Sequence, residues 1–332
     1  MSTDVAIIGA GIAGLSAART LRRAGLSVAI VDKGRGVGGR LATRRIGDAR
    51  LDHGAQFFTV RGEDFATLVN EAIEADVVEV WCHGFSSEDG YPRYSCPGGM
   101  TGLAKWLAAD LASQDVEITL ERRVESIAAH VDQRDETVWA LRDNDDTLLT
   151  ARHVIVTAPV PQALDLFDAS HIAPSPTVLE ALRAISYHRV LGLLVALDGP
   201  PAIPEPGAVQ SGNDAPFTFI ADNVTKGVSQ NPAVTFHANH ALSAARWDDP
   251  QDEVIEDFLT LAQPWFGNAQ VTHVELKKWL YAGPVTPYPD RSVTIVSDPG
   301  LIVLGGDAFG GPKVEGAFNS GTACAKEILP DR

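Results

Sequence analysis

Three glycines and one carboxylate near the start of the chain have the spacing of a dinucleotide-binding site. Gly9, Gly11 and Gly14 form a GxGxxG pattern, and Asp32 follows downstream. In such a site the first glycine permits a tight turn, the second lets a pyrophosphate approach the backbone, and the third lets a helix pack closely on a strand. The carboxylate accepts hydrogen bonds from an adenosine ribose. The pattern therefore predicts a site for the adenosine and phosphates of a dinucleotide.

The elements that such a motif requires are predicted on both sides of it. Val5–Ile8 is an apolar run, too short for a helix and rich in β-branched residues, which indicates a buried strand. Apolar residues then recur at helical spacing from Ile12 to Ala24, and Gly25 is placed to end that helix. Ser27–Val31 is a second apolar strand that ends at Asp32. The helix N-terminus would offer unpaired N–H groups and a positive dipole end to a phosphate.

The C-terminal part of the chain repeats the combination of strand, acid and helix. Leu301–Leu304 is apolar and is followed by two glycines and Asp307, and a last helix is predicted from Val314 to about Leu329. A long dinucleotide that reached both places would have its adenosine near Asp32 and its ribityl chain near Asp307. No second GxGxxG follows a strand, which favours FAD over NAD. The dipole of the last helix would stabilise negative charge on a reduced flavin ring.

Composition excludes several classes of protein. The chain has 332 residues, 45% of them hydrophobic, which suits two domains with sizeable cores. Its net charge of −16 disfavours nucleic acid and anionic membranes as partners. No apolar run reaches the roughly 18 to 20 residues that span a bilayer, and no basic segment precedes the first apolar run, so neither a membrane span nor a signal peptide is predicted. Three scattered cysteines fit a reducing cytoplasm, although a bridge between Cys82 and Cys96 stays open.

The order of the predicted elements indicates an α/β fold. We expect a Rossmann-type FAD-binding domain with a β-meander between Val116 and Val156, and an α+β substrate domain built on an antiparallel sheet. Further helices are predicted at residues 64–75, 103–111 and 252–262. The FAD-binding domain is expected to be discontinuous and to comprise residues 1–75, 98–160 and 285–332, and the substrate domain residues 76–97 and 161–284.

Several sequence blocks, in order along nearly the whole chain, resemble FAD-dependent flavoproteins of the amine oxidase fold. Most closely they resemble the renalase family, especially its bacterial members, and the match is loosest at residues 160–275. The blocks are GAGIAGLSAARTL, DKGRGVGGR, DHGAQFFTVR, PGGM, VIVTAP, KKWLYA, and GGD followed by VEGAFNSG. The resemblance implies non-covalent FAD and oxidation of misreduced dihydronicotinamide (NAD(P)H) isomers, with electrons passed to dioxygen to give hydrogen peroxide. A dihydropyridine is already a hydride donor, so no catalytic acid or base is assigned.

The motif and the resemblance together imply a set of cofactor positions on both halves of the chain. Val314 and Glu315 stand at the predicted start of the last helix, and Arg40 would supply a phosphate-binding fork. The set comprises Gly9, Gly11, Ala13, Gly14, Asp32, Lys33, Gly39, Arg40, Gly54, Ala55, Gln56, Phe57, Val124, Gly306, Asp307, Val314, Glu315 and Ala317.

The substrate positions are less well specified. Arg61 could anchor a substrate phosphate, and Trp279 and Tyr281 alternate along a strand, so they share one face. His237 is read either as a substrate contact or as a structural residue. Bacterial renalases tend to follow this histidine with Trp-Ser and to have tryptophan at the position of Ala308, and this chain has neither, so the exact substrate stays open. The predicted substrate set is Phe57, Arg61, His237, Trp279, Tyr281 and Ala308.

Two other functions remain open. A flavin amine oxidase acting on a small primary or secondary amine often holds a water with a lysine beside the flavin, whereas the corresponding strand here begins Tyr187-His188-Arg189. A non-enzymatic flavin-binding or electron-transfer protein would lack an aromatic and cationic substrate lining. No metal is predicted, because His237 and His240 have no carboxylate or cysteine at ligand spacing. Cys324, in the last helix, is interpreted as packed rather than as a covalent flavin attachment.

Overall fold

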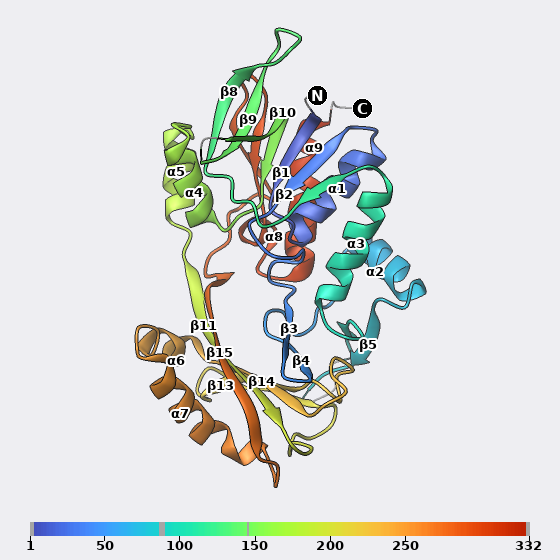
Figure 1. Cartoon of the computed structure of the whole chain (residues 1–332), viewed down its shortest axis with the longest axis vertical. Coiled ribbons are helices and arrows are strands. Elements are labelled where there is room, and N and C mark those ends of the chain that lie inside the picture. Colours follow the sequence, from blue (N-terminus) through green and yellow to red (C-terminus); the bar gives the residue numbers. More distant parts are fainter. Residues whose placement is uncertain (1–2, 86–89, 145, 330–332) are drawn as a thin grey trace. The chain divides into compact units, whose positions relative to one another are not determined.

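The chain folds into two compact units, each built from separate stretches of sequence. The computed structural model describes residues 3–85, 90–144 and 146–329. The first unit comprises Met1–Gly39, Ala104–Ser186 and Gly283–Arg332, and the second comprises Arg40–Leu103 and Tyr187–Ala282. Figure 1 shows both in the colours of the sequence. The predicted domain ranges also include residues 1–2, 86–89, 145 and 330–332, which lie outside the described residues.

The first unit is organised around a sheet with the order β16-β17-β10-β1-β2-β7. Its central strands β1, β2, β10 and β17 are parallel, and Ile8 pairs with both Val31 and Val156. These strands read as continuous apolar runs because a parallel sheet is buried on both faces. The strands of this unit are β1 (Thr3–Ile8), β2 (Val28–Val31), β7 (Glu117–Thr119), β8 (Ser126–Val131), β9 (Thr137–Asp143), β10 (Asp146–Val156), β16 (Val293–Val296) and β17 (Ile302–Leu304).

The predicted β-meander is present in part. Strands β8, β9 and β10 pair in sequence as antiparallel neighbours. The first strand of the predicted stretch, β7, does not join them, because it pairs in parallel with β2 through Ile30 and Ile118. Local alternation of apolar residues indicates a strand but carries no information about which strand it pairs with. Here the partner, β2, lies far earlier in the sequence.

In the first unit, the helices predicted near the two ends of the chain are present, and two further helices in between were not predicted. The predicted helix after the glycine motif and the predicted last helix are both present, and Gly25 ends the former with a positive φ of 89°. Two helices, Val160–Ala169 and Pro176–Arg183, were not predicted from the sequence, and each has a proline in its first turn. Proline is accepted in the first turn of a helix, where no N–H partner is needed. The helices are α1 (Ile12–Arg23), α3 (Thr101–Ser113), α4 (Val160–Ala169), α5 (Pro176–Arg183), α8 (Asp307–Gly310) and α9 (Val314–Ile328).

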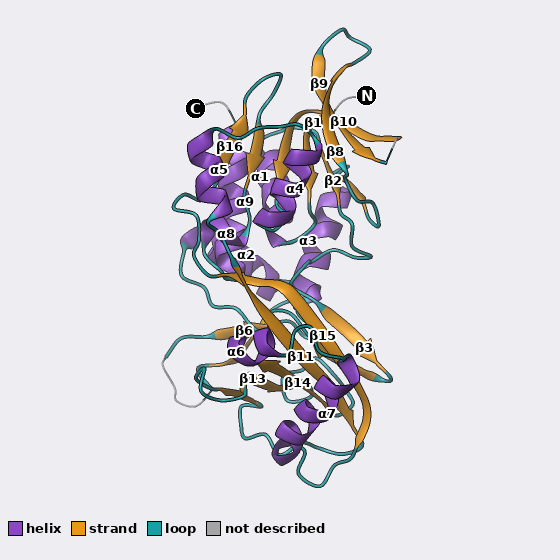
Figure 2. Ribbon diagram, turned by 90° about the vertical axis from the view of Figure 1, so that its left-hand side faces the viewer, coloured by secondary structure: helices purple, strands orange, loops and turns teal. Residues whose placement is uncertain are grey.

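The second unit contains a five-stranded sheet with the order β12-β13-β14-β11-β15, which confirms the predicted antiparallel sheet for the strand pairs 12–13, 13–14 and 14–11. Helix α7 packs Val254 and Phe258 against Phe236 and neighbouring strand residues in an apolar core. Figure 2 shows α6 and α7 beside this sheet. The elements are β3 (Thr43–Ile46), β4 (Ala49–Asp52), α2 (Glu63–Glu74), β5 (Glu79–Cys82), β6 (Arg93–Ser95), β11 (Tyr187–Leu197), β12 (Ala208–Gln210), β13 (Phe217–Asp222), β14 (Ala233–Ala238), α6 (His240–Ala245), α7 (Gln251–Ala262), the 3-10 turn Gln263–Trp265 and β15 (Val271–Pro284).

The boundaries of the units differ from the predicted domain ranges. Residues 40–75 and 98–103 belong to the second compact unit, and residues 161–186 and 283–284 belong to the first. Compactness does not test which residues contact a cofactor or a substrate, so the functional roles of the two domains stay a prediction. Among the residues that the structure describes, no helix is both long enough and apolar enough to cross a membrane.

Candidate cofactor and substrate sites

The two predicted cofactor motifs of the first unit lie at the same edge of one sheet. The backbone N–H of Gly9 donates to the carbonyl of Val31 at 2.9 Å, which ties the end of β1 to the end of β2. The N–H of Gly305 donates to the carbonyl of Val156 at 3.0 Å, which ties the end of β17 to the end of β10. In open α/β sheets, ligands bind beyond the carboxyl ends of the strands. The structure therefore brings the N-terminal glycines and the C-terminal Gly-Gly-Asp to the edge at which ligands bind in sheets of this type.

The glycine turn has the shape that a pyrophosphate requires. Gly9 has a φ of +114°, a conformation that other residues rarely adopt. A Cβ at Gly14 would lie 1.9 Å from the carbonyl oxygen of Gly9, so only glycine lets α1 pack this closely on the turn. A Cβ at Gly11 would meet no atom within 4 Å, and no side chain caps α1 at this residue. Open space beside an uncapped helix N-terminus, where the predicted Ala13 also lies, fits an anionic group.

Asp32 braces this turn with its carboxylate. Its Oδ2 accepts a hydrogen bond from the N–H of Ala10 and its Oδ1 accepts one from the N–H of Gly34, both at 2.6 Å. A carboxylate has about four acceptor positions, so two remain for ribose hydroxyls. The predicted ribose acceptor is thus also the residue that holds the two glycine-rich loops together.

Three further predicted cofactor residues, Gly39, Lys33 and Val124, lie in loops of the first unit. Gly39 ends the glycine-rich segment, which returns to the motif through a bridge between Gly11 and Gly38. Lys33 donates from Nζ to the side chain of Gln162 at 2.8 Å, and partial burial lowers the pKa of the lysine. Val124 lies in the loop between β7 and β8.

The C-terminal motif is fixed to the sheet and to helix α9 (Val314–Ile328). The N–H of Gly306 donates to Ser320 Oγ at 2.8 Å, and the following Asp307 is 8% exposed. Helix α9 begins at Val314, and no side chain caps its N-terminus. The predicted Glu315 and Ala317 therefore lie in the first turn of a helix that has no side-chain cap. This geometry fits the remainder of an FAD molecule, although contact with FAD remains a prediction for each residue.

Other predicted cofactor residues lie in the second unit. The carbonyl of Arg40 accepts a hydrogen bond from the N–H of Ala55 at 2.9 Å, so Arg40 lies against the predicted Gly54-Ala55 pair. The guanidinium of Arg40 donates from Nη1 to the carbonyl of Tyr281 at 3.1 Å. Tyr281 in turn makes an edge contact with Tyr187. The structure thus gathers Arg40, Gly54, Ala55 and Tyr281 within one unit.

Two of the predicted substrate residues lie in aromatic surroundings. Phe57 contacts Phe85 and Phe219 with ring centroids 5.0 and 5.7 Å apart, and the guanidinium of Arg93 lies 5.8 Å from the Phe57 ring. Arg61, the predicted phosphate anchor, lies over the ring of Tyr91 at 3.8 Å.

A second aromatic group brings two predicted substrate residues onto one backbone carbonyl. Trp279 donates from its indole Nε1 to the carbonyl of His53 at 2.6 Å, and its ring stacks on the imidazole of His53 with centroids 5.3 Å apart. His237 places its Nε2 3.3 Å from the same carbonyl. Lys277 Nζ lies 5.1 Å from the Trp279 ring centroid. We call His53, His237 and Trp279 the ring cluster.

Both histidines of the ring cluster are neutral at pH 7. Burial, with smaller contributions from the charges of Lys277 and Arg44, lowers the pKa of His53 to about 3. Burial also lowers the pKa of His237 to about 4, and Lys226 adds to that effect. Because a carbonyl only accepts hydrogen bonds, neutral His237 must carry its proton on Nε2. The cluster is therefore an uncharged surface, and the charge that accompanies it is cationic.

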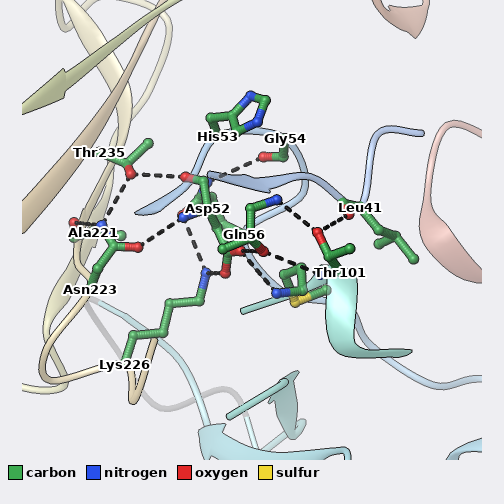
Figure 3. Close-up of polar contacts among 12 residues, drawn as sticks. Leu41, Asp52, His53, Gly54, Gln56, Thr101, Ala221, Asn223, Lys226 and Thr235 are labelled. Atoms are coloured by element: carbon green, nitrogen blue, oxygen red, sulfur yellow. Dashed lines mark hydrogen bonds and ion pairs between the residues drawn. The ribbon is translucent and has the colours of Figure 1, made fainter. Parts of the chain in front are cut away.

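Sequence reasoning missed the polar network beneath this cluster. Lys226 forms an ion pair with Asp52 at 2.8 Å, and both side chains are fully buried. Figure 3 shows the side chain of Lys226 extending to the side chain of Asp52. Asp52 belongs to the DHGAQFFTVR block, but Lys226 belongs to no motif and lies among other polar residues such as Asp222 and Asn223, so nothing in the sequence singles it out.

The cysteines and the remaining histidine act as packing residues. None of the three cysteines forms a disulfide, and burial raises the pKa of both Cys96 and Cys324 to about 12. His240 stacks on His188 with centroids 3.7 Å apart. Within the described ranges, no three histidine, cysteine or acidic side chains are grouped so that they could hold a metal ion. Ala308 is buried in α8, and its carbonyl accepts a hydrogen bond from the N–H of Tyr288.

Comparison with known protein families gives two matches that together span most of the chain. Residues 7–72 match the NAD(P)-binding Rossmann-like domain, and residues 78–329 match the flavin containing amine oxidoreductase family. A curated relative, putrescine oxidase of Kocuria rosea, is 41% identical over 68 residues. That match covers 20% of this chain and 14% of the enzyme's length.

Solved structures show the same fold across the whole chain. Cyclohexylamine oxidase from Brevibacterium oxydans IH-35A superimposes with a TM-score of 0.69 at 16% identity, and 99% of each chain is covered. Putrescine oxidase bound to putrescine superimposes with a TM-score of 0.68 at 17% identity, again over 99% of each chain. At this level of identity the likeness concerns the fold, which confirms the predicted Rossmann-type domain combined with a sheet-rich second domain.

Proposed function

The chain belongs to the family of flavin containing amine oxidoreductases, and we propose that within it the protein is an FAD-dependent oxidase of the renalase type. Its substrates are misreduced dihydronicotinamide (NAD(P)H) isomers, and FAD is held without a covalent bond. The substrate loses a hydride and becomes the ordinary oxidised nicotinamide. Dioxygen takes up the two electrons with protons and leaves as hydrogen peroxide. The absence of disulfides among the three described cysteines accords with a reducing, cytoplasmic setting.

The first unit supports the cofactor part of the proposal. The open space at Gly11 and the uncapped start of α1 suit the pyrophosphate, and Asp32 has acceptor positions left for the ribose. Asp307 and the start of α9 lie at the same sheet edge and suit the ribityl end. When bound, FAD supplies the hydride acceptor, and the chain's own residues bind and orient the reactants.

The observation that carries the substrate class is the ring cluster beside a cation. A dihydronicotinamide dinucleotide has a flat ring and an anionic pyrophosphate, whereas an amine substrate is a cation. The stacked rings of His53 and Trp279 suit a flat partner, and Lys277 at 5.1 Å from the Trp279 ring favours an anion.

The chemistry of the proposed reaction asks little of the side chains. A dihydropyridine gives up a hydride without the help of a base, so the protein has to orient the ring and exclude water. Strand β11 corresponds to the strand on which flavin amine oxidases often have a water-holding lysine. In this chain it contains no lysine from Tyr187 to Leu197. This supports hydride donation by a preformed dihydropyridine rather than oxidation of an amine.

Anaerobic mixing tests the proposal. We expect dihydronicotinamide isomers to remove the visible absorbance of the bound flavin within seconds, and amines such as putrescine or cyclohexylamine to leave it unchanged. Readmitted dioxygen should restore the absorbance and give one equivalent of hydrogen peroxide per equivalent of substrate. Loss of absorbance with amines alone would overturn the renalase assignment.

Amine oxidation is the second candidate, and the family match and the similarity to putrescine oxidase favour it. The same mixing experiment decides between the two, because each substrate class has its own arm. A flavin that neither class reduces would instead support a flavin-binding or electron-transfer role without a small substrate.

A further inference from the structure

The most completely buried charges described in the second unit lie directly beneath the ring cluster. Lys226 Nζ lies 2.8 Å from Asp52 Oδ2, and both side chains have 0% exposure. The same ammonium group lies 3.3 Å from Gln56 Oε1. Figure 3 shows the lysine side chain reaching Asp52 and Gln56 from one side. An ammonium group and a carboxylate that are both shielded from solvent depend on each other for charge compensation and hydrogen bonds. Their relative geometry is therefore strictly constrained.

Asp52 is also fixed by its neighbours through its backbone and its second oxygen. Its carbonyl accepts hydrogen bonds from Thr235 Oγ1 at 2.8 Å and from Gln56 Nε2 at 2.7 Å. Its N–H donates to Asn223 Oδ1 at 3.1 Å. Its Oδ1 accepts a hydrogen bond from the N–H of Met100 at 2.9 Å. Both peptide groups that flank the Asp52 Cα are therefore held, and the carboxylate is held at both oxygens.

The residue after Asp52 carries the carbonyl on which the ring cluster converges. His53 accepts the Trp279 indole proton at 2.6 Å, and His237 Nε2 lies 3.3 Å away. The N–H of His53 donates to the carbonyl of Ala42 at 2.9 Å. A rotation of the Asp52–His53 segment would move this carbonyl and release both rings. The buried pair thus determines the direction of the acceptor that orients them.

We propose that Asp52 and Lys226 form a positioning pair, which orients Trp279 and His237 through the carbonyl of His53. A buried ion pair is seldom more stable than apolar side chains of the same volume, and its directional hydrogen bonds specify one geometry. The proposal rests on the proposed function only in taking the ring cluster as the substrate surface. The orientation of the rings by the pair is a property of the chain itself.

Exchange of the Trp279 indole proton with solvent, followed by NMR on the FAD-loaded protein, measures this orientation directly. We expect Lys226→Met and Asp52→Asn each to accelerate exchange of the Trp279 indole proton by about tenfold or more. The indole of Trp139 donates to the carbonyl of Gly300 at 2.9 Å in the first unit and serves as the reference for global opening. Lys226 also lies 5.4 Å from the Trp81 ring, so only an effect shared by both variants reports the pair.

The double variant Asp52→Asn with Lys226→Met separates positioning from stability. It leaves no unpaired buried charge, so we expect its melting temperature to recover most of what either single variant loses. Exchange at Trp279 should nevertheless stay fast, because the ion pair is gone. Replacement of an exposed lysine, Lys105→Met, should leave both quantities unchanged.

Recovery of slow Trp279 exchange in the double variant would overturn the proposal and leave the pair a purely structural role, as would Trp279 rates that follow Trp139 in every variant. With the substrate that reduces the wild-type flavin, kcat/KM should fall by about tenfold in the single and double variants. If neither substrate class reduces the wild-type flavin, the proposed function fails, whereas the exchange rates still decide on the positioning pair.

Discussion

Asp32 joins two tasks that the sequence motif assigns to different groups. Its carboxylate accepts the N–H groups of Ala10 and Gly34, and so holds the glycine turn against the glycine-rich loop that follows. Its remaining acceptor positions suit the ribose hydroxyls of a dinucleotide. In the proposed site the same side chain would both shape the phosphate-binding turn and bind the neighbouring sugar, so its loss should affect cofactor affinity twice.

Replacing Asp32 should weaken FAD binding strongly. For Asp32→Ala we expect the dissociation constant of FAD to rise by about 10- to 100-fold, since hydrogen bonds to a charged group contribute about 1.5–3 kcal/mol. Titration of the apoprotein with FAD, followed by flavin fluorescence, measures this. The exposed Asp165 of α4 lies in the same unit, and Asp165→Ala is the matched control, with affinity like the wild type. Unchanged affinity in Asp32→Ala would contradict the role of this carboxylate.

Residues of the site could be predicted where the chemistry is local in the sequence. Gly9, Gly11, Gly14 and Asp32 lie within one strand, helix and strand, so their spacing alone indicated their arrangement. The partner of Asp52 could not be found in this way. Lys226 is 174 residues away and has no motif around it, and only the fold brings the two charges together.

Helices α1 and α9 form the contact on which the cofactor edge of the first unit depends. A Cβ at Gly321 of α9 would lie 1.9 Å from the carbonyl oxygen of Ala13 in α1, and Ser16 Oγ donates to the carbonyl of Phe318 at 2.9 Å. Backbone therefore packs on backbone at this crossing. Because both helices begin at the same sheet edge, their separation sets the distance between the two proposed ends of the FAD site.

A single methyl group at this crossing should disturb both stability and cofactor binding. We expect Gly321→Ala to lower the free energy of unfolding by about 3 kcal/mol, since overpacking commonly costs 1–3 kcal/mol and here the clash is with backbone. Urea denaturation of the apoprotein measures the loss, and FAD affinity should fall in parallel. At Gly102 of α3 a Cβ would meet Cys96 at an ordinary 3.5 Å, so Gly102→Ala is the control, expected to be neutral or slightly stabilising. Equal effects of the two substitutions would contradict the packing argument.

Helices and strands with a strong hydrophobic period could be predicted from the sequence. Those that depend on contacts with distant parts of the chain could not. The helices at Ile12–Arg23 and Val314–Ile328 and the apolar parallel strands follow from patterns within each segment. Helices α4 and α5 were not predicted, although Ser175 caps α5 and Pro176 occupies its first turn. Strand β7 was predicted to belong to the β-meander, but it pairs with β2, and the pairing of distant strands is decided by the fold rather than by the local sequence.

At the scale of the whole molecule, the proposed FAD edge exists only when distant parts of the chain have assembled. Strand β1 pairs with β10, and β10 pairs with β17, so residues near 8, 156 and 304 meet in one sheet. The second unit is likewise built from two stretches of chain, and its ring cluster joins His53 to Trp279. Each cofactor motif carries its signal within a short segment, so the cofactor could be inferred from the sequence, whereas the contacts that join the ring cluster appear only in the fold.

The flavin content of the purified chain tests the central claim most directly. We predict a yellow protein that, on denaturation, releases about one FAD per chain, identified by its mass and its visible spectrum, with no flavin left attached to the polypeptide. Reconstitution of the apoprotein with FAD should restore the same spectrum. A folded, colourless protein that takes up no added FAD would contradict the account.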